Sequence, residues 1–422
     1  MTMIKAALAA TTAFTVLASM PVQAFAQDGA ALRVFVGAQQ RPDLMQQLFD
    51  MYEEQNPGVT VELETGGATS ELQSNYLSTV LSAQDSAIDI MLIDVVNPAQ
   101  YRAAGWLEPL NDHIDGDVET FVSQYLPAYA EADVIDGDLV ALPAFADAMM
   151  LFYRTDLFEA AGIEPPTTWE EVEQAAATIK QGEGNADIQG LSFQARAIEG
   201  AVCTFLIPYW SQGGAIETGS RQPLNEEYAV NSFNVWLDMV ESGTSKANIA
   251  EVGTDDTRRE FQAGDVAMAV LWPYGWAHFQ GDESEVVGNV GVATLPTTEG
   301  GESVSCLGGW QWAVSAFSEN KDAAADLIQF LASEEASKFL AVEGSMLPTR
   351  SELYADADVL AANAWFEQAL PVMETARARP TSPNYQRVSD TIRSRVNAVL
   401  AGAEAPDAAV SAMQGELARA LR

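Results

Sequence analysis

The sequence is poor in histidine and in basic residues. Its only two histidines, His113 and His278, are too few for a histidine metal cluster. Sixty acidic residues against 21 lysines and arginines give a net charge of −39, which argues against nucleic acid and anionic membranes as partners. The acidic residues are scattered along the chain, and we interpret this pattern as a surface suited to salt-rich surroundings.

The sequence also lacks the motifs of several common enzyme classes. It contains no Walker A loop and no GxGxxG, HExxH or GxSxG pattern. The Asp-Gly-Asp pieces at 115–117 and 136–138 do not continue as calcium-binding loops, and we interpret both as turns. A catalytic pair of Cys306 and His278 has no local support in the sequence. We therefore expect no metal ion and no cofactor.

Cysteine is nearly absent as well. Cys203 and Cys306 are the only two cysteines of the chain. In an oxidising compartment they can pair, but their separation along the sequence says nothing about their distance in the fold. A disulfide and two buried free thiols fit the sequence equally.

Long apolar runs are confined to the N-terminus. Lys5 precedes an apolar stretch from about Ala7 to Met20, and residues 24–26 (Ala-Phe-Ala) offer a cleavage site between small residues. This stretch is too short for a convincing membrane span, and no cysteine follows it to carry a lipid. Residues 1–26 therefore predict a signal peptide, and we expect a soluble protein in the periplasm. Loss of Lys5 takes the 21 bases to 20 and the net charge from −39 to −40.

The rest of the chain alternates between strand and helix patterns. Strands are expected at residues 32–36, 59–63, 88–93, 148–153, 189–194, 266–271, 290–293 and 311–314. Between them lie amphipathic segments, one opened by the capping box Thr168–Glu171, and the tail from 385 is helical. This order predicts an α/β protein with mainly parallel sheets flanked by helices. The alternation restarts after a hairpin at Asp136-Gly137, which predicts a second lobe joined by several short crossings.

An aromatic segment follows the apolar run 266–271. It places Trp272, Tyr274 and Trp276 around a proline and a glycine, a combination that excludes the middle of a helix or of a central strand. Loops that leave buried strands commonly carry ligand sites in α/β proteins. We interpret the three aromatics together as a binding surface. For each of them taken alone, a core position is the favoured interpretation.

Polar candidates stand at the ends of other strands. Asp94 closes the strand at 88–93, Asp147 precedes the strand at 148–153, and Arg350 offers a rigid donor fork. Trp310 follows Gly308-Gly309, which we expect to form a turn. Aromatic faces stack on the C–H faces of sugars while charged groups bond their hydroxyls, so this set predicts a sugar site. Either aspartate also fits a helix cap or a turn, and two carboxylates also fit a glycosidase.

Six short segments, taken in order, resemble one protein family. They are residues 56–63 (NPGVTVEL), 105–110 (GWLEPL), 152–157 (FYRTDL), 272–276 (WPYGW), 307–310 (LGGW) and 347–350 (LPTR). The chain resembles family 1 of the extracellular solute-binding proteins, the periplasmic receptors of ABC sugar importers, and is similar to their trehalose/maltose-binding branch. The similarity extends over the whole mature chain.

The resemblance implies a two-lobed periplasmic binding protein fold of type II, with the ligand in the cleft between the lobes. The N-terminal lobe would comprise residues 27–146 and 311–345, and the C-terminal lobe residues 147–310 and 346–422. The ligand-binding residues implied are Gln39, Gln40, Asp43, Gln73, Asp94, Asp147, Trp272, Tyr274, Gly309, Trp310 and Arg350. Asp43, Gln73 and Asp94 would belong to one lobe. Trp272, Tyr274 and Trp310 would belong to the other. Gln73-Ser74 stands where this branch has an arginine, so the ligand is open among disaccharides, α-glucosides, glycosyl-polyols and polyols.

The resemblance further implies a monomeric receptor without enzymatic activity. It would close on one sugar and deliver it to a membrane permease with a cytoplasmic ATPase. Two alternatives remain at this point. One is a secreted glycoside hydrolase using Asp94 and Asp147, and the other is a receptor for a charged glycoside or polyamine that exploits the acidity.

Overall fold

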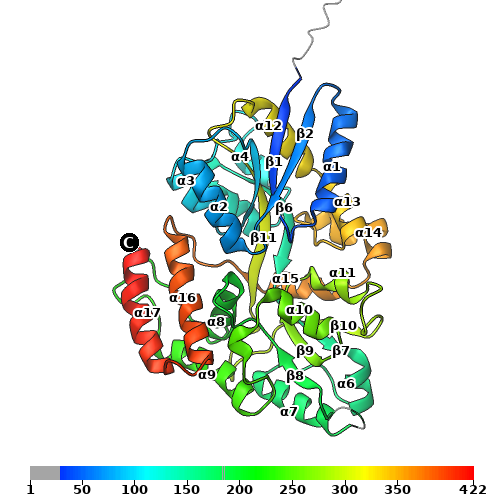
Figure 1. Ribbon diagram of the computed structural model, residues 1–422, viewed down its shortest axis with the longest axis vertical. Helices are drawn as coiled ribbons and strands as arrows, with labels where there is room; N and C mark the ends of the chain where they lie inside the picture. Colours follow the sequence, from blue (N-terminus) through cyan, green and yellow to red (C-terminus); the bar gives the residue numbers. More distant parts are fainter. Residues whose placement is uncertain (1–28, 183, 185) are drawn as a thin grey trace, which may run out of the picture.

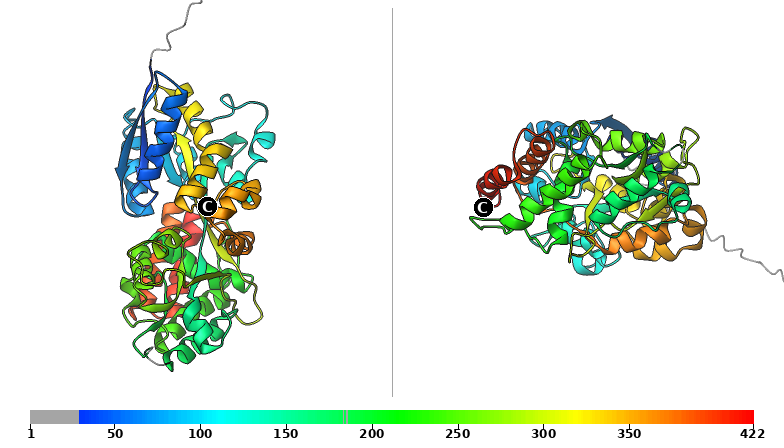
Figure 2. Two further views of the ribbon diagram at one scale, coloured as in Figure 1. Left: turned by 90° about the vertical axis from the view of Figure 1, so that its right-hand side faces the viewer. Right: turned by 90° about the horizontal axis from the view of Figure 1, so that it is seen from below.

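The computed structural model describes residues 29–422 apart from residues 183 and 185, so the predicted signal peptide lies outside the described residues. Two α/β bodies lie one above the other and meet at a narrow waist (Figures 1 and 2). We call the body around strands β1, β2 and β3 the first lobe and the body around β7, β8, β9 and β10 the second lobe.

The first lobe is built on a six-stranded sheet in the order β12-β11-β3-β1-β2, with β6 also paired to β11. The strands of this sheet are β1 (Ala31–Gly37), β2 (Thr60–Gly66), β3 (Ile90–Asp94), β6 (Leu142–Ala148), β11 (Ser305–Val314) and β12 (Ala376–Arg377). The short β12 pairs with Ser305 and Cys306, at the end of β11 that lies toward the second lobe. Its helices are α1 (Pro42–Gln55), α2 (Ser70–Ser82), α3 (Pro98–Ala103), α4 (Val118–Val122), α5 (Pro127–Asp133), α12 (Lys321–Leu331) and α13 (Glu334–Gly344). A small hairpin joins β4 (Val134–Ile135) to β5 (Asp138–Leu139).

Alternation along the strands gives this sheet two buried faces. Val34 of β1 packs in a core with Leu48 of α1 and Trp312 of β11. Its neighbour Phe35 faces the opposite core, with Leu77 of α2. Because successive strand residues point to opposite faces, helices must cover both sides of the sheet. β1 pairs with β2 and β3 in parallel, whereas β11 is antiparallel to both β3 and β6.

The second lobe is built on a four-stranded sheet in the order β10-β7-β9-β8. Its strands are β7 (Met150–Arg154), β8 (Gln189–Ser192), β9 (Val266–Leu271) and β10 (Val290–Ala293). Around it lie α6 (Thr155–Ala161), α7 (Trp169–Lys180), α8 (Glu199–Ser211), α9 (Glu226–Glu241), α10 (Thr254–Gln262), α11 (Gly275–Phe279), α14 (Ala357–Ala362), α15 (Phe366–Glu374), α16 (Tyr385–Leu400) and α17 (Pro406–Ala420). Two 3₁₀ turns, η1 (Ile249–Glu251) and η2 (Ser351–Ala355), complete this set.

The α/β architecture with two lobes is confirmed, with one refinement of the sheets. β7 is antiparallel to both β9 and β10, and only β8 and β9 run in parallel. The second sheet is therefore mixed rather than mainly parallel.

Two local predictions are confirmed in detail. Asp136 and Gly137 form the turn between β4 and β5 with φ values of 54° and 89°, as a type I′ hairpin requires. The Thr168 hydroxyl accepts a hydrogen bond from the Glu171 amide, and the Glu171 carboxylate accepts one from the Thr168 amide. This reciprocal pair caps the start of α7.

One other prediction is wrong, and another is refined. Gly308 and Gly309 are not a turn but the middle of β11, which begins at Ser305. A Cβ atom at Gly309 would lie 2.5 Å from the Tyr129 ring, so the glycine serves close packing rather than reversal. The aromatic segment after β9 also becomes partly helical, because α11 begins at Gly275 directly after Pro273-Tyr274.

Three chain segments lie side by side at the waist. Ala146 of β6 is paired with Gly309 of β11 and also with Leu347. The Ala146 amide donates to the Leu347 carbonyl at 2.7 Å. The Tyr129 hydroxyl bridges two of these segments. It accepts a hydrogen bond from the Asp147 amide and donates one to the Gly308 carbonyl at 2.9 Å.

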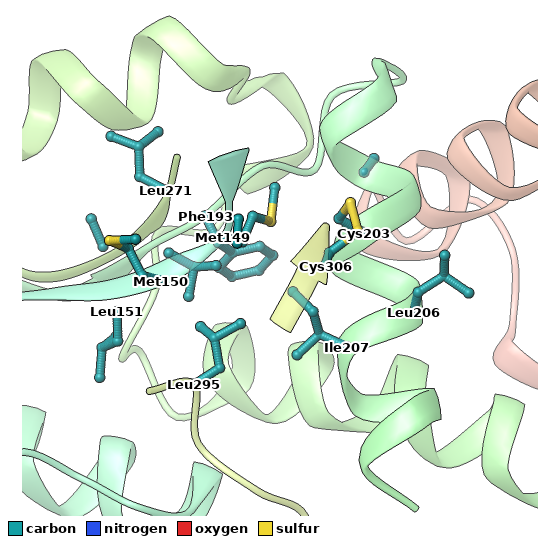
Figure 3. Packing of buried hydrophobic residues seen from close by; sticks show 14 of the residues in the cluster. Met149, Met150, Leu151, Phe193, Cys203, Leu206, Ile207, Leu271, Leu295 and Cys306 are labelled. Carbon is teal, nitrogen blue, oxygen red and sulfur yellow. A yellow bond between two sulfur atoms is a disulfide. The ribbon is translucent and has the colours of Figure 1, made fainter. Parts of the chain in front are cut away.

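The two cysteines form a disulfide in the core of the second lobe. It links Cys203 of α8 to Cys306 of β11, with the Cα atoms 5.6 Å apart. Figure 3 shows it among apolar side chains that include Phe193 and Ile207, and all of these residues are fully buried. The sequence left this choice open, and the structure selects the disulfide. Within the described residues, no helix has the length and hydrophobicity needed to cross a membrane.

The disulfide should contribute strongly to stability, because it closes a chain segment of 103 residues. Replacing both Cys203 and Cys306 by serine should lower the free energy of unfolding by about 2–4 kcal/mol. Urea unfolding of the double variant measures this loss. Treating the wild-type protein with a thiol reductant should lower its stability in the same direction. An unchanged unfolding midpoint in both experiments would contradict the prediction.

Candidate functional site

A cavity of about 490 Å³ lies between the two lobes. The first lobe lines it with the β1–α1 connection (38–43), the start of α2 and the end of β3. The second lobe contributes the start of α8, the start of α10 and the segment from Trp272 to His278. Residues of the waist form its floor. A ligand in this cavity therefore contacts both lobes at once.

Nine of the eleven residues predicted for the site line this cavity. They are Gln39, Gln40, Asp43, Asp94, Asp147, Trp272, Tyr274, Gly309 and Trp310. Gln73 and Arg350 do not belong to the lining.

Gln73 lies directly behind the β1–α1 connection. Its side-chain amide donates to the Gly67 carbonyl at 3.0 Å. A Cβ atom at Gly37 would collide with both Gln40 and Gln73, so these two side chains meet beside that glycine. Gln73 is thus placed to support the cavity wall from behind.

Arg350 is used inside the first lobe. Its guanidinium donates to the Gln124 side chain at 2.7 Å and to the Ala332 carbonyl at 3.1 Å. The same group lies 4.9 Å from the centre of the Tyr125 ring. Its donor fork is therefore occupied by partners outside the cavity.

The aromatic lining comes from both lobes. Trp272 belongs to the second lobe, and a Cβ atom at Gly308 would lie 2.6 Å from its ring. Trp310 pairs with Asp94 in the first sheet and packs against the first-lobe core, rather than on the second lobe as expected. Trp276 turns away from the cavity and stacks on Trp365 at 4.9 Å. Of the three aromatics after β9, two therefore face the cavity.

An ion triplet forms part of the cavity wall. Arg379, which is 4% exposed, donates to Asp94 and to Glu199 at 2.7 Å each. The second oxygen of Asp94 accepts from the Ser70 hydroxyl at 2.8 Å. Asp94 belongs to the first lobe and Glu199 to the second, so the arginine connects carboxylates of both lobes. The burial of a charged guanidinium is tolerated because two carboxylates compensate it.

Asp147 differs from the other carboxylates of the lining. Its Oδ1 is buried and has no hydrogen-bond partner among the described residues. Burial raises the pKa of Asp147 to about 8, the nearby charge of Asp94 adds to this, and Arg379 opposes it. The Oε1 atom of Gln40 is likewise buried without a partner among the described residues. Buried polar atoms are normally satisfied, so these two mark places where a ligand can bond.

Arg379 and Glu199 were not predicted from the sequence. Arg379 stands in a segment without helical or strand periodicity, Ala376–Pro380, where little distinguishes it from Arg377. Glu199 offered a usable signal, because it is the single charged residue of the otherwise apolar segment 199–211. A lone carboxylate at the start of a buried helix usually has a partner. Among the described residues, no group of three His, Cys, Asp or Glu side chains is arranged to hold a metal ion.

Two α/β lobes around a cavity that both of them line define a two-lobed binding protein. The family of bacterial extracellular solute-binding proteins matches residues 26–338 of the chain. A probable ABC transporter-binding protein of Deinococcus radiodurans is 34% identical over 370 residues, which are 86% of this chain and 87% of the relative. A mannitol-binding protein of Pseudomonas aeruginosa is 24% identical over 402 residues, 90% of each chain.

Solved structures show the same architecture. Maltose-bound MalE3 of T. maritima superimposes with a TM-score of 0.85 at 30% identity, covering 92% of this chain and 99% of that one. A ribitol complex of an ABC transporter solute-binding protein from Agrobacterium radiobacter gives a TM-score of 0.82 at 25% identity, over 93% and 99% of the two chains. The chain belongs to the bacterial extracellular solute-binding protein family and has its type II periplasmic binding protein fold. It is a solute-binding protein of an ABC transporter.

The raised pKa of Asp147 predicts a pH-dependent stability. Its ordinary value is 3.8 and its folded value about 8, so between these values the folded protein holds a proton that the unfolded chain has lost. Stability should therefore fall as the pH rises from about 5 to 8. Asp147→Asn should reduce this fall, measured as the free energy of urea unfolding at several pH values. Asp43→Asn should leave it unchanged, because Arg41 lowers the pKa of Asp43. Equal slopes in the wild type and Asp147→Asn would contradict the assignment.

Proposed function

We propose that this protein captures a neutral sugar or polyol in the cavity between its lobes and delivers it to a membrane permease. The observation that carries the proposal is the pairing of aromatic faces with unpaired buried acceptors. Trp272 and Trp310 come from opposite lobes, and Asp147 and Gln40 each present a buried oxygen without a partner among the described residues. Sugars need this combination of apolar faces and hydrogen-bond acceptors.

The proposed ligand contacts are the nine predicted residues of the lining together with Arg379. The tryptophan rings would cover the C–H faces of the ligand, while Asp147 and Gln40 bond its hydroxyls. Gln73 would hold Gln40 in place rather than contact the ligand. The relatives described as maltose- and ribitol-bound support a carbohydrate or polyol as the ligand class.

Closure of the two lobes would trap the ligand. The hinge would be the waist, where residues 146, 309 and 347 lie side by side. The two lobes would then comprise residues 27–146 with 311–345, and 147–310 with 346–422, except that Trp310 and Arg350 pack with the first lobe. Because the cavity walls belong to both lobes, only the closed state makes all contacts, and the ligand stabilises that state.

The proposed cellular role follows from the family. Residues 1–26 would direct export to the periplasm and be removed there. The closed, loaded receptor would then dock as a monomer on a permease with a cytoplasmic ATPase.

The charge state of the cavity favours a neutral ligand over a cation. The other carboxylates of the lining have positive partners: Asp43 bonds Arg41, Glu71 bonds Arg393, Asp255 bonds Arg258, and Asp94 and Glu199 share Arg379. Asp147 is the exception, but its pKa of about 8 keeps it mostly neutral at pH 7. The acidity of the whole chain is therefore not concentrated in the site.

The arrangement also speaks against the glycosidase alternative. A glycosidase needs one carboxylate free to attack or to activate water. Asp94 is instead bonded to Arg379 and Ser70 through its two oxygens. We infer that the aspartates bind the ligand and do not cleave it.

Tryptophan fluorescence during titration tests the proposal. The panel should contain trehalose, maltose, sucrose, glucosylglycerol, mannitol and ribitol, and each ligand should be recovered afterwards. We expect a saturable change with at least one of them and its recovery intact. Release of reducing sugar would support the hydrolase instead. No fluorescence change with the panel, together with a salt-sensitive change on adding spermidine, would contradict the proposal of a neutral ligand.

Trp272→Ala should weaken binding of the ligand identified in that panel. Loss of one large side chain that the ligand would cover predicts an effect of about 1–3 kcal/mol on the binding free energy, measured by isothermal titration calorimetry. Trp276→Ala is the matched control, because Trp276 stacks on Trp365 outside the cavity. It should leave the affinity close to that of the wild type. If both variants bind the ligand with the affinity of the wild type, Trp272 does not contact the ligand.

A further inference from the structure

Glu71, at the start of α2 in the first lobe, is bonded to the second lobe. Its carboxylate forms an ion pair with Arg393 of α16 at 3.0 Å. The same oxygen accepts a hydrogen bond from the backbone amide of Glu199. The two charged side chains are only 14% and 17% exposed, so solvent and salt screen the pair less than an ordinary surface pair.

The bond to Glu199 completes a helix terminus. Glu199 is the first residue of α8, and Ile198 before it has no side chain that can cap the helix. The first amides of a helix have no partner within the helix and attract negative charge. Glu71 therefore supplies, from the opposite lobe, the cap that α8 lacks in its own sequence.

Further contacts follow the same seam between the lobes. The side chain of Gln386 in α16 donates to Asn75 of α2 at 2.9 Å. The backbone amide of Gln386 donates to the Gln100 side chain of α3 at 3.3 Å. In Figure 1, α2 and α3 lie above α16 and α8 on one side of the waist. Arg393 itself is not part of the cavity lining, whereas its partner Glu71 is.

We propose that Arg393 is a positioning residue for the ligand cavity. Acting through Glu71, it holds α2 against the start of α8 and stabilises the closed arrangement of the lobes. The inference rests on the proposed function where it concerns a sugar, but the contacts between the lobes do not depend on the ligand. Loss of Arg393 should therefore open the empty protein and release a bound ligand faster.

The test compares two arginines of the same helix. Arg393→Gln removes the ion pair with Glu71 between the lobes. Arg395→Gln removes ion pairs with Glu404 and Glu416, all within the second lobe, and is the matched control. Arg393→Lys keeps the positive charge, so its behaviour should lie between that of Arg393→Gln and that of the wild type.

Small-angle X-ray scattering of the ligand-free proteins is the first measurement. The radius of gyration of Arg393→Gln should exceed that of the wild type and of Arg395→Gln. Stopped-flow fluorescence with the panel ligand that binds the wild type is the second. Arg393→Gln should weaken its binding roughly three- to tenfold, the range expected for one partly buried ion pair, mainly through a faster dissociation rate.

The two measurements separate the failure of this inference from that of the proposed function. If no panel ligand binds the wild type but scattering shows an opened Arg393→Gln, the positioning role stands and the sugar proposal fails. If a ligand binds and Arg393→Gln matches Arg395→Gln in size and dissociation rate, the positioning role is overturned. Should Arg393→Gln not fold, Gln386→Ala provides the second variant, with the same directions expected and the same result overturning the inference.

Discussion

The structure depends on one strand that is shared by both lobes. β11 lies in the second-lobe core at Cys306, where the disulfide fixes it to α8, and in the first-lobe core at Trp312. Between these anchors, Gly308 and Gly309 leave room for the rings of Trp272 and Tyr129 to pack against the backbone. The cavity floor, the waist and the two cores are thus coupled through ten residues of a single strand. A side chain at either glycine would displace an aromatic ring that either forms the cavity or bridges the waist.

Basic residues are scarce in this chain, and their positions determine which carboxylates are paired. With 60 acids and 21 bases, most carboxylates cannot have a positive partner. Surface carboxylates need none, because water solvates them, whereas carboxylates in a cavity between two lobes do. Two arginines are found where carboxylates are buried between the lobes. Arg379 serves Asp94 and Glu199 together, and Arg393 serves Glu71. An acid-rich chain can therefore keep a nearly neutral binding site.

The sequence predicted the parts of the fold that local patterns determine. Strands such as residues 266–271 are recognisable because they are uninterrupted apolar runs, and the Asp136-Gly137 turn because only certain residues adopt positive φ at both positions. Gly308-Gly309 was misjudged because a glycine pair has two physical uses, reversal of the chain and close packing. Nothing within the sequence neighbourhood distinguishes these uses. The difference lies in Trp272 and Tyr129, which are distant along the chain.

The same limit explains the arginines of the site. Arg350 and Arg379 both stand within short irregular segments, and a donor fork in either place looks suited to a ligand. Which of them faces the cavity depends on the path of the chain after its last passage between the lobes at Leu347. This path depends on how α13, α15 and α16 pack. Trp310 shows the complementary case. Its place in the lining was predicted, but its lobe was not, because the pairing of β11 with β3 begins at Trp310 itself and includes this residue in the first sheet.

The contacts between the lobes also bear on how tightly such a site can bind. The apparent affinity of a closing receptor is the affinity of the closed state reduced by the fraction of molecules that are closed. The Asp94–Arg379–Glu199 triplet and the Glu71–Arg393 pair stabilise the closed arrangement before any ligand contact is made. The Glu71–Arg393 pair lies outside the proposed ligand contacts, so it would shift the closing equilibrium without changing the selectivity that we propose for Trp272, Trp310 and Asp147. Affinity and specificity can consequently change separately in this fold, since different side chains determine them.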